Sequence, residues 1–135
     1  MKKKSVIIAL LAIATAAVQA ADLFTAIATV ESNGNDYAVG DRGRAIGRYQ
    51  LWKVYVDDVN RIAGTSYTYA DRTDPEKALQ MVKIYIGHYA ARYERLTGKT
   101  ATDEVKARLH NGGPNGYKKG ATIAYWNKVK KEMGK

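Results

Sequence analysis

The sequence contains no cysteine among its 135 residues and only two histidines. The absence of cysteine excludes disulfides, thiolate nucleophiles and Cys-ligated zinc, so the fold has to be stabilised by packing. His88 and His110 are far apart in the sequence, which argues against a His-based metal site. We therefore predict that the protein binds no metal and no cofactor.

The sequence also lacks an apolar run of about 20 residues, the length that a membrane-spanning helix needs. The run from Val6 to Ala17 has 12 residues. Three lysines precede it and the small residues of Val18-Gln19-Ala20 follow it, which is typical of a secretory signal peptide cleaved after Ala20. We predict a signal peptide over residues 1–20, one domain over residues 21–135, no stable membrane span after cleavage, and a secreted or periplasmic product.

Acidic residues are scarce, since 13 Asp and Glu stand against 22 Lys and Arg and the net charge is +9. Removal of Lys2, Lys3 and Lys4 with the signal peptide leaves +6. A basic surface on an exported protein favours an anionic partner, such as an anionic cell-wall polymer or a membrane surface. Nucleic acid is the generic alternative, but export and the absence of a zinc-finger or basic-zipper signature argue against it.

Apolar residues recur at helical spacing through most of the domain, and one stretch favours strands instead. The pattern predicts helices over residues 23–31, 49–63, 75–97, 102–109 and 121–133, with a loop over residues 110–116. Short β-prone pieces flank the Gly40-Asp41-Arg42-Gly43 turn and predict a small, irregular β-hairpin over residues 37–46. The expected fold is mainly α, an α+β domain of about five helices and one small hairpin.

The longest predicted helix has clear signals at both ends. Asp74 is a candidate N-cap, Pro75 then occupies the first helical position, and Gly98 follows the last one. Six apolar residues form one stripe along this helix: Leu79, Val82, Ile86, Tyr89, Tyr93 and Leu96. We expect this stripe to face the core and the helix to be central.

Glu31 is the main candidate for chemistry. It lies four residues after Ile27, at the edge of the apolar stripe of the first helix, so its carboxyl group is expected to be partly buried. Burial raises the pKa of a carboxyl group, as a general acid near neutral pH requires, and glycoside hydrolysis uses that chemistry. A second carboxylate is then needed unless the substrate takes its role. Asp41, at the hairpin turn, is favoured over Asp36, whose carboxylate could bond its own turn backbone.

The motifs around these residues resemble two known families. Glu31-Ser32, Ala45-Ile46-Gly47 and Gln50 resemble the E-S…A-I-G-x-x-Q signature of soluble-type lytic transglycosylases, and residues 111–114 resemble their N-A-G-P loop. Residues 47–57 resemble the G-x-F-Q-I-x-x-x-Y-x-D run of invertebrate-type lysozymes, and residues 107–114 are similar to the same family. Both families belong to the lysozyme-like superfamily, which implies a lysozyme-like fold with a glycan cleft.

The resemblance implies roles for individual residues. Glu31 matches the catalytic acid, and Asp41 lies near the position of the second carboxylate of invertebrate-type lysozymes. The predicted substrate-binding residues lie in or beside the matching motifs: Ser32, Gly47, Tyr49, Gln50, His110, Asn111, Gly112, Gly113 and Tyr125. The chemistry of these residues agrees with a glycan cleft, because amides donate to and accept from sugar hydroxyls and glycines let a ligand approach the backbone.

These observations favour an exported muramidase that cleaves the β-1,4 bond between N-acetylmuramic acid and N-acetylglucosamine in peptidoglycan glycan strands. Lysozyme-type hydrolysis is favoured by residues 47–57 and 110–114. A lytic transglycosylase that leaves 1,6-anhydro ends is the alternative, favoured by the segment around Tyr125. An alternative from another class is a non-catalytic module of the same fold that binds the cell wall or an inhibitor. We expect a monomer.

Overall fold

The computed structural model describes residues 21–135, and the predicted signal peptide over residues 1–20 lies outside the described residues. The elements follow in the order α1 (Leu23–Ser32), β1 (Val39–Gly40), η1 (Asp41–Gly43), β2 (Ala45–Ile46), α2 (Lys53–Ala63), η2 (Tyr69–Thr73), α3 (Pro75–Thr97), α4 (Asp103–Gly112), η3 (Gly116–Lys118), η4 (Gly120–Thr122) and α5 (Ile123–Glu132), where η is a 3-10 helix. The prediction of a mainly helical domain with one small hairpin is confirmed. Within the described part, no helix is both long and apolar enough to cross a membrane.

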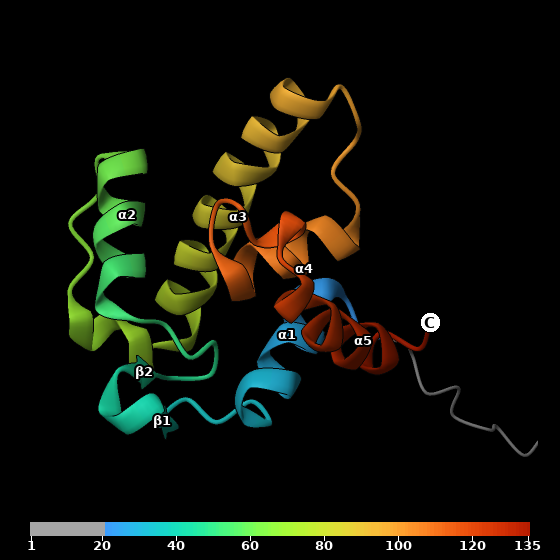
Figure 1. Cartoon of the computed structure of the whole chain (residues 1–135). Helices are drawn as coiled ribbons and strands as arrows, with labels where there is room; N and C mark the ends of the chain where they lie inside the picture. Colours follow the sequence, from blue (N-terminus) through green and yellow to red (C-terminus); the bar gives the residue numbers. More distant parts are fainter. Residues whose placement is uncertain (1–20) are drawn as a thin grey trace, which may run out of the picture.

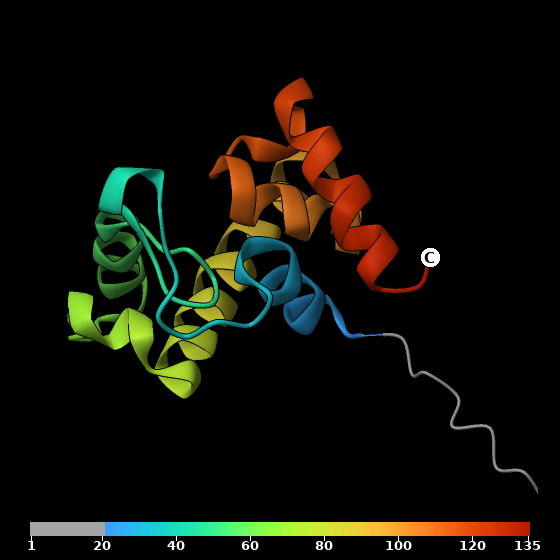
Figure 2. The same cartoon turned by 90° about the horizontal axis from the view of Figure 1, so that it is seen from below.

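Helix α3 runs through the middle of the molecule (Figure 1). The hairpin and α2 lie on one side of it, and α1, α4 and α5 gather on the other side, as the view from below also shows (Figure 2). The predicted caps of α3 are present: the Asp74 side chain accepts a hydrogen bond from the Lys77 N–H, and Gly98 ends the helix with a φ of 69°. Leu96 is 62% exposed instead of buried, because the last turn of α3 extends beyond the elements that pack on it.

Helix α2 begins at Lys53, four residues later than the spacing predicts. The preceding residues form a turn in which the Gln50 N–H donates to the Gly47 carbonyl and Gln50 has a φ of 52°. Leu51 and Ile46 then exchange two backbone hydrogen bonds, at 3.0 and 3.1 Å, and extend the two-residue β1–β2 pairing. The bridge to Ile46 takes Leu51 out of the helix, although its apolar side chain is buried as expected.

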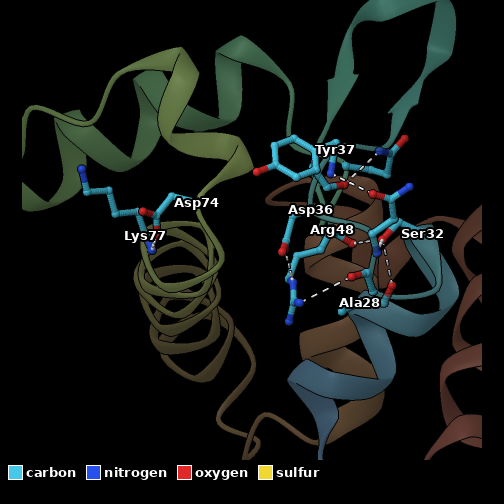
Figure 3. A network of polar contacts seen from close by, with 11 residues as sticks. Ala28, Ser32, Asp36, Tyr37, Arg48, Asp74 and Lys77 are labelled. Atoms are coloured by element: carbon cyan, nitrogen blue, oxygen red, sulfur yellow. Dashed lines mark hydrogen bonds and ion pairs between the residues drawn. The ribbon is translucent and has the colours of Figure 1, made fainter.

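A polar network connects the end of α1 to the segment after β2 (Figure 3). The Ser32 hydroxyl contacts the Arg48 carbonyl at 2.8 Å and the Ala28 carbonyl at 3.3 Å, and it accepts from the Asn35 N–H. Arg48 Nε donates to Asp36 at 2.7 Å in an ion pair. Asp36 therefore bonds Arg48 instead of its own turn backbone, because the hairpin segment folds back over the end of α1.

Gly47 allows a close backbone approach between the segment after β2 and η2. Its φ is 84°, and a Cβ atom at this position would lie 2.0 Å from the carbonyl oxygen of Arg72. A side chain is therefore excluded both by the backbone conformation and by space. The glycine that matches the family motifs has a packing role here.

We expect Gly47→Ala to destabilise the fold more than Gly34→Ala does. Gly34 also has a positive φ, 72°, but a Cβ atom added there would have no neighbouring atom within 4 Å. Gly34→Ala is thus expected to cost only the backbone strain of about 1–2 kcal/mol. Gly47→Ala is expected to cost about 1–3 kcal/mol more through overpacking against Arg72. Urea unfolding measures both values, and equal losses would contradict the close approach.

Candidate active site

A cavity of about 740 Å³ opens between the two sides of the molecule. We call it the cleft. Six of the predicted site residues line it: Glu31, Asp41, Gln50, His110, Asn111 and Gly113. They come from α1, η1, the turn before α2, and the end of α4, so the fold brings together residues as distant in sequence as Glu31 and His110, which are 79 residues apart.

Glu31 lies in the last turn of α1, and its side chain is 19% exposed. Its Oε2 atom lies 3.2 Å from Nε2 of His110. Its other oxygen, Oε1, has no hydrogen-bond partner among residues 21–135. One carboxylate oxygen is therefore held by the protein while the other remains available to a ligand in the cleft.

The partners of His110 define its tautomer. Nε2 lies 3.2 Å from both Glu31 Oε2 and the Tyr49 carbonyl, and a carbonyl only accepts, so Nε2 carries the hydrogen. The Tyr55 hydroxyl lies 3.0 Å from Nδ1, and in the Nε2–H tautomer it donates to Nδ1. Burial raises the pKa of Tyr55 well above its ordinary value, which keeps the phenol protonated as a donor. The result is a directed chain of hydrogen bonds from Tyr55 through His110 to Glu31.

The end of α4 differs from the prediction. Residues 110–112 belong to the helix instead of to a loop, and Gly113 ends it with a φ of 82° while its N–H donates to the Leu109 carbonyl at 2.9 Å. This extension places His110 within the helix, with Nε2 at 3.2 Å from Glu31 Oε2. Gly112 faces η4 instead of the cleft, because a Cβ atom there would lie 2.6 Å from Thr122 Cγ2.

Five predicted substrate-binding residues lie outside the cleft wall: Ser32, Gly47, Tyr49, Gly112 and Tyr125. Ser32, Gly47 and Gly112 are used in the contacts described above. The Tyr49 ring is buried, and this residue reaches the site only through its carbonyl. Tyr125 is also buried, and burial together with the charge of Glu31 raises the pKa of its hydroxyl, which has no partner among the described residues. These residues lie outside the cleft wall and stabilise the segments that form it.

Gln50 both lines the cleft and bonds the backbone of the hairpin segment. It lines the cleft, but its side-chain nitrogen donates to the carbonyls of Gly47 and Ala38, at 3.0 and 3.2 Å. Its Oε1 atom lies against Gly40, where a Cβ atom would be only 2.2 Å away. Gln50 therefore fixes the hairpin that carries Asp41.

Three aspartates line the cleft besides Glu31. Asp58 accepts from Arg61 and from the Tyr89 hydroxyl, and Asp57 accepts from the Tyr69 hydroxyl at 2.9 Å. Asp41 has no side-chain partner among residues 21–135, and its φ is 46° in the hairpin turn. Of the three, Asp41 is the carboxylate that the protein leaves free to meet a ligand.

The sequence reasoning missed one wall of the cleft. It is built by a face of α2 that carries Val54, Asp57, Asp58 and Arg61, with Trp52 just before the helix. These four positions have the i, i+3, i+4, i+7 spacing of one helix face, which was the available signal. The adjacent face carries Tyr55, which also lines the cleft and stacks on Tyr85 of α3 with ring centroids 3.8 Å apart. No group of three or more metal-ligating side chains occurs within the described chain.

The family model of the transglycosylase SLT domain matches residues 11–131. The chain belongs to this family. Among curated relatives, the lysozyme of Ostrea edulis is 36% identical over 91 residues, 67% of this chain and 62% of that protein. The lysozyme of Meretrix lusoria is 47% identical over 51 residues, 38% of this chain and 42% of that protein. The chain thus spans less than two thirds of the length of these relatives.

A solved structure supports the same grouping. A chain in the crystal structure of Aeromonas hydrophila PliI in complex with Meretrix lusoria lysozyme superposes with a TM-score of 0.66 at 32% identity, over 81% of this chain and 86% of that one. The predicted membership of the lysozyme-like superfamily is confirmed. The matched family model is that of a transglycosylase domain, and the curated relatives are named lysozyme.

In this SLT domain, we expect Tyr55→Phe to disturb His110 and Tyr85→Phe to leave it unchanged. Loss of the Tyr55 hydroxyl leaves buried Nδ1 without its donor, which costs about 1–3 kcal/mol of stability. The Tyr85 hydroxyl, in the same stacked pair, bonds no group within residues 21–135 and serves as the control. Nitrogen-15 NMR of the imidazole is expected to show the Nε2–H tautomer in the unmodified protein and a changed spectrum only in Tyr55→Phe. An Nδ1–H tautomer in the unmodified protein would contradict the assignment.

Proposed function

We propose that the protein is an exported muramidase that hydrolyses the β-1,4 bond between N-acetylmuramic acid and N-acetylglucosamine in peptidoglycan. The observation that carries the proposal is the setting of Glu31: a mostly buried carboxyl group in a cleft, held at one oxygen by His110 and open at the other. In this role Glu31 protonates the leaving glycosidic oxygen through Oε1. The lysozyme names of the relatives support the same reaction class.

Asp41 is the proposed second carboxylate. It lines the same cleft as Glu31 and comes from the hairpin, whereas Glu31 comes from α1. A carboxylate without a protein partner can stabilise positive charge that develops on the sugar ring, or attack C1 and form a covalent intermediate. Asp36, the other sequence candidate, is neutralised by Arg48 and does not line the cleft.

The polar groups of the cleft suit a glycan chain. The exposed Asn111 amide can donate to and accept from sugar hydroxyls and N-acetyl groups. Trp52 offers an aromatic surface at the opposite wall. We infer that glycan strands are the substrate, that the protein acts as a secreted or periplasmic monomer, and that its positive charge assists approach to anionic wall polymers.

Two alternatives remain open to experiment. The SLT family match supports a lytic transglycosylase, in which Glu31 acts first as acid and then as base and draws the muramic 6-hydroxyl onto C1. The other alternative is a non-catalytic module that binds the cell wall or an inhibitor. Such a module has no use for a carboxyl group set against a buried histidine, so the variant of Glu31 separates it from both enzymes.

We expect Glu31→Gln to reduce cleavage of purified peptidoglycan by about 10²–10⁴-fold, since it removes the proton donor but keeps an acceptor for His110. The control Glu132→Gln changes the same charge on the exposed face of α5 and is expected to retain full activity. Release of soluble fragments measures both variants, and circular dichroism verifies that they fold. Undiminished cleavage of peptidoglycan by the Glu31→Gln variant would contradict the proposal.

Mass spectrometry of the released fragments tests the role of Asp41. Hydrolysis gives reducing ends, whereas transglycosylation gives 1,6-anhydro ends that are lighter by one water. We expect reducing ends, and we expect Asp41→Asn to slow their formation because the developing positive charge loses its counter-charge. Predominantly anhydro ends, with Asp41→Asn fully active, would establish the transglycosylase alternative.

A further inference from the structure

A second cavity of about 330 Å³ adjoins the cleft. Seven residues line it: Arg42, Gly43, Arg44, Trp52, Lys53, Val54 and Arg72. We call it the basic pocket. Trp52 and Val54 line both cavities, so the basic pocket and the cleft share one wall. A group attached to a sugar in the cleft can therefore reach the basic pocket without leaving the protein surface.

The charge of the basic pocket is of one sign. Four of its seven residues are cationic and none is acidic. Within residues 21–135, none of these four side chains forms an ion pair with a carboxylate. Three of them lie over aromatic rings instead: Arg44 is 5.4 Å from the centroid of Trp52, and Lys53 and Arg72 are 5.1 and 5.7 Å from that of Tyr69. These contacts orient the cations but leave their charge uncompensated.

Arg72 is a buried and hydrogen-bonded part of the basic pocket, which is therefore more than a chance grouping of surface cations. The residue is only 8% exposed. Its Nε donates to the Tyr69 carbonyl at 2.8 Å, and its Nη1 donates to the carbonyls of Leu51 and Arg44, at 3.1 and 3.4 Å. Nη2 has no hydrogen-bond partner in the described part of the chain. A buried guanidinium held only by carbonyls gains stability when an anion approaches it.

The start of α2 adds backbone donors to the same wall. Trp52 is the N-cap residue and makes no side-chain cap, and the N–H groups of Lys53 and Val54 have no acceptor among residues 21–135. Both residues line the basic pocket. The positive end of the helix dipole therefore reinforces the four cations.

We propose that the basic pocket binds a carboxylate of the peptide stem that is attached to a muramic acid residue in the cleft. The proposal rests on the proposed function, since it takes the cleft as the glycan site. A carboxylate carried by the bound sugar is favoured over a separate phosphodiester polymer because the basic pocket shares a wall with the cleft. The guanidinium fork also pairs with a carboxylate through two parallel hydrogen bonds. Val54 and Trp52 give the apolar part of the stem a surface to pack on.

Binding of soluble glycan fragments with and without their peptide stems tests this proposal. The full-length domain carries Glu31→Gln so that the fragments remain intact, and calorimetry gives Kd. We expect the peptide-bearing fragment to bind about tenfold more tightly than the same glycan without peptide. Arg42→Gln combined with Lys53→Gln is expected to abolish this preference. Both side chains are exposed, so the fold is expected to survive, whereas Arg72 is left unchanged because it is buried.

Lys128→Gln combined with Lys130→Gln is the matched control, since it removes the same charge from the exposed face of α5 and is expected to keep the preference. Equal affinity for both fragments, or a preference that survives the pocket variant, would overturn the proposal. The proposal would also be overturned if a phosphodiester polymer bound the basic pocket and the peptide-bearing fragment did not. The binding experiment does not depend on catalysis. If the unmodified protein failed to cleave peptidoglycan, that result would reject the muramidase proposal but not the proposed binding of the peptide stem.

Discussion

The site depends on the hydrogen bonds of the buried His110 imidazole. The imidazole lies on α4, accepts from Tyr55 of α2, and donates to Glu31 of α1 and to the Tyr49 carbonyl before α2. These partners are 55, 79 and 61 residues away in sequence, so the contact forms only when both sides of the molecule are docked on α3. A buried ring with both nitrogens hydrogen-bonded fixes the direction in which the Glu31 side chain can point. The geometry of the acid is therefore a property of the whole fold.

The sequence predicts well those features whose signals are local. Asp74, Pro75 and Gly98 define α3 within its own residues, and the structure places the helix at Pro75–Thr97 as expected. The predicted start of α2 was wrong because the deciding interaction is not local to the helix: Leu51 has helical spacing from Tyr55, but its backbone pairs with Ile46. A hydrogen-bonded bridge that closes a short turn outweighs the propensity of a few residues, and periodicity alone does not reveal it.

The site was predicted unevenly for a related reason. A motif identifies positions but does not say whether a residue faces the ligand or the protein. Glu31, Asp41 and Asn111 face the cleft, whereas Ser32 and Gly47 in the same motifs hold its walls together. The polar face of α2 was not assigned to the cleft from the sequence. Only the docking of α2 against α3, with Tyr55 stacked on Tyr85, shows that this face borders the cleft.

The charges around the cleft are arranged by sign. The cleft holds Glu31 and three aspartates, of which Asp57 and Asp58 are bonded by protein donors and Asp41 is not. The uncompensated cations lie beyond Trp52, in the basic pocket. In the proposed reaction, the carboxylates favour positive charge on the sugar ring in the transition state and repel anionic groups from the reacting centre. The cations attract those same anionic groups to the adjoining pocket. A muramic acid that carries an anionic stem would thus be oriented by both fields in the same direction, with its ring beside Glu31 and its stem across Trp52.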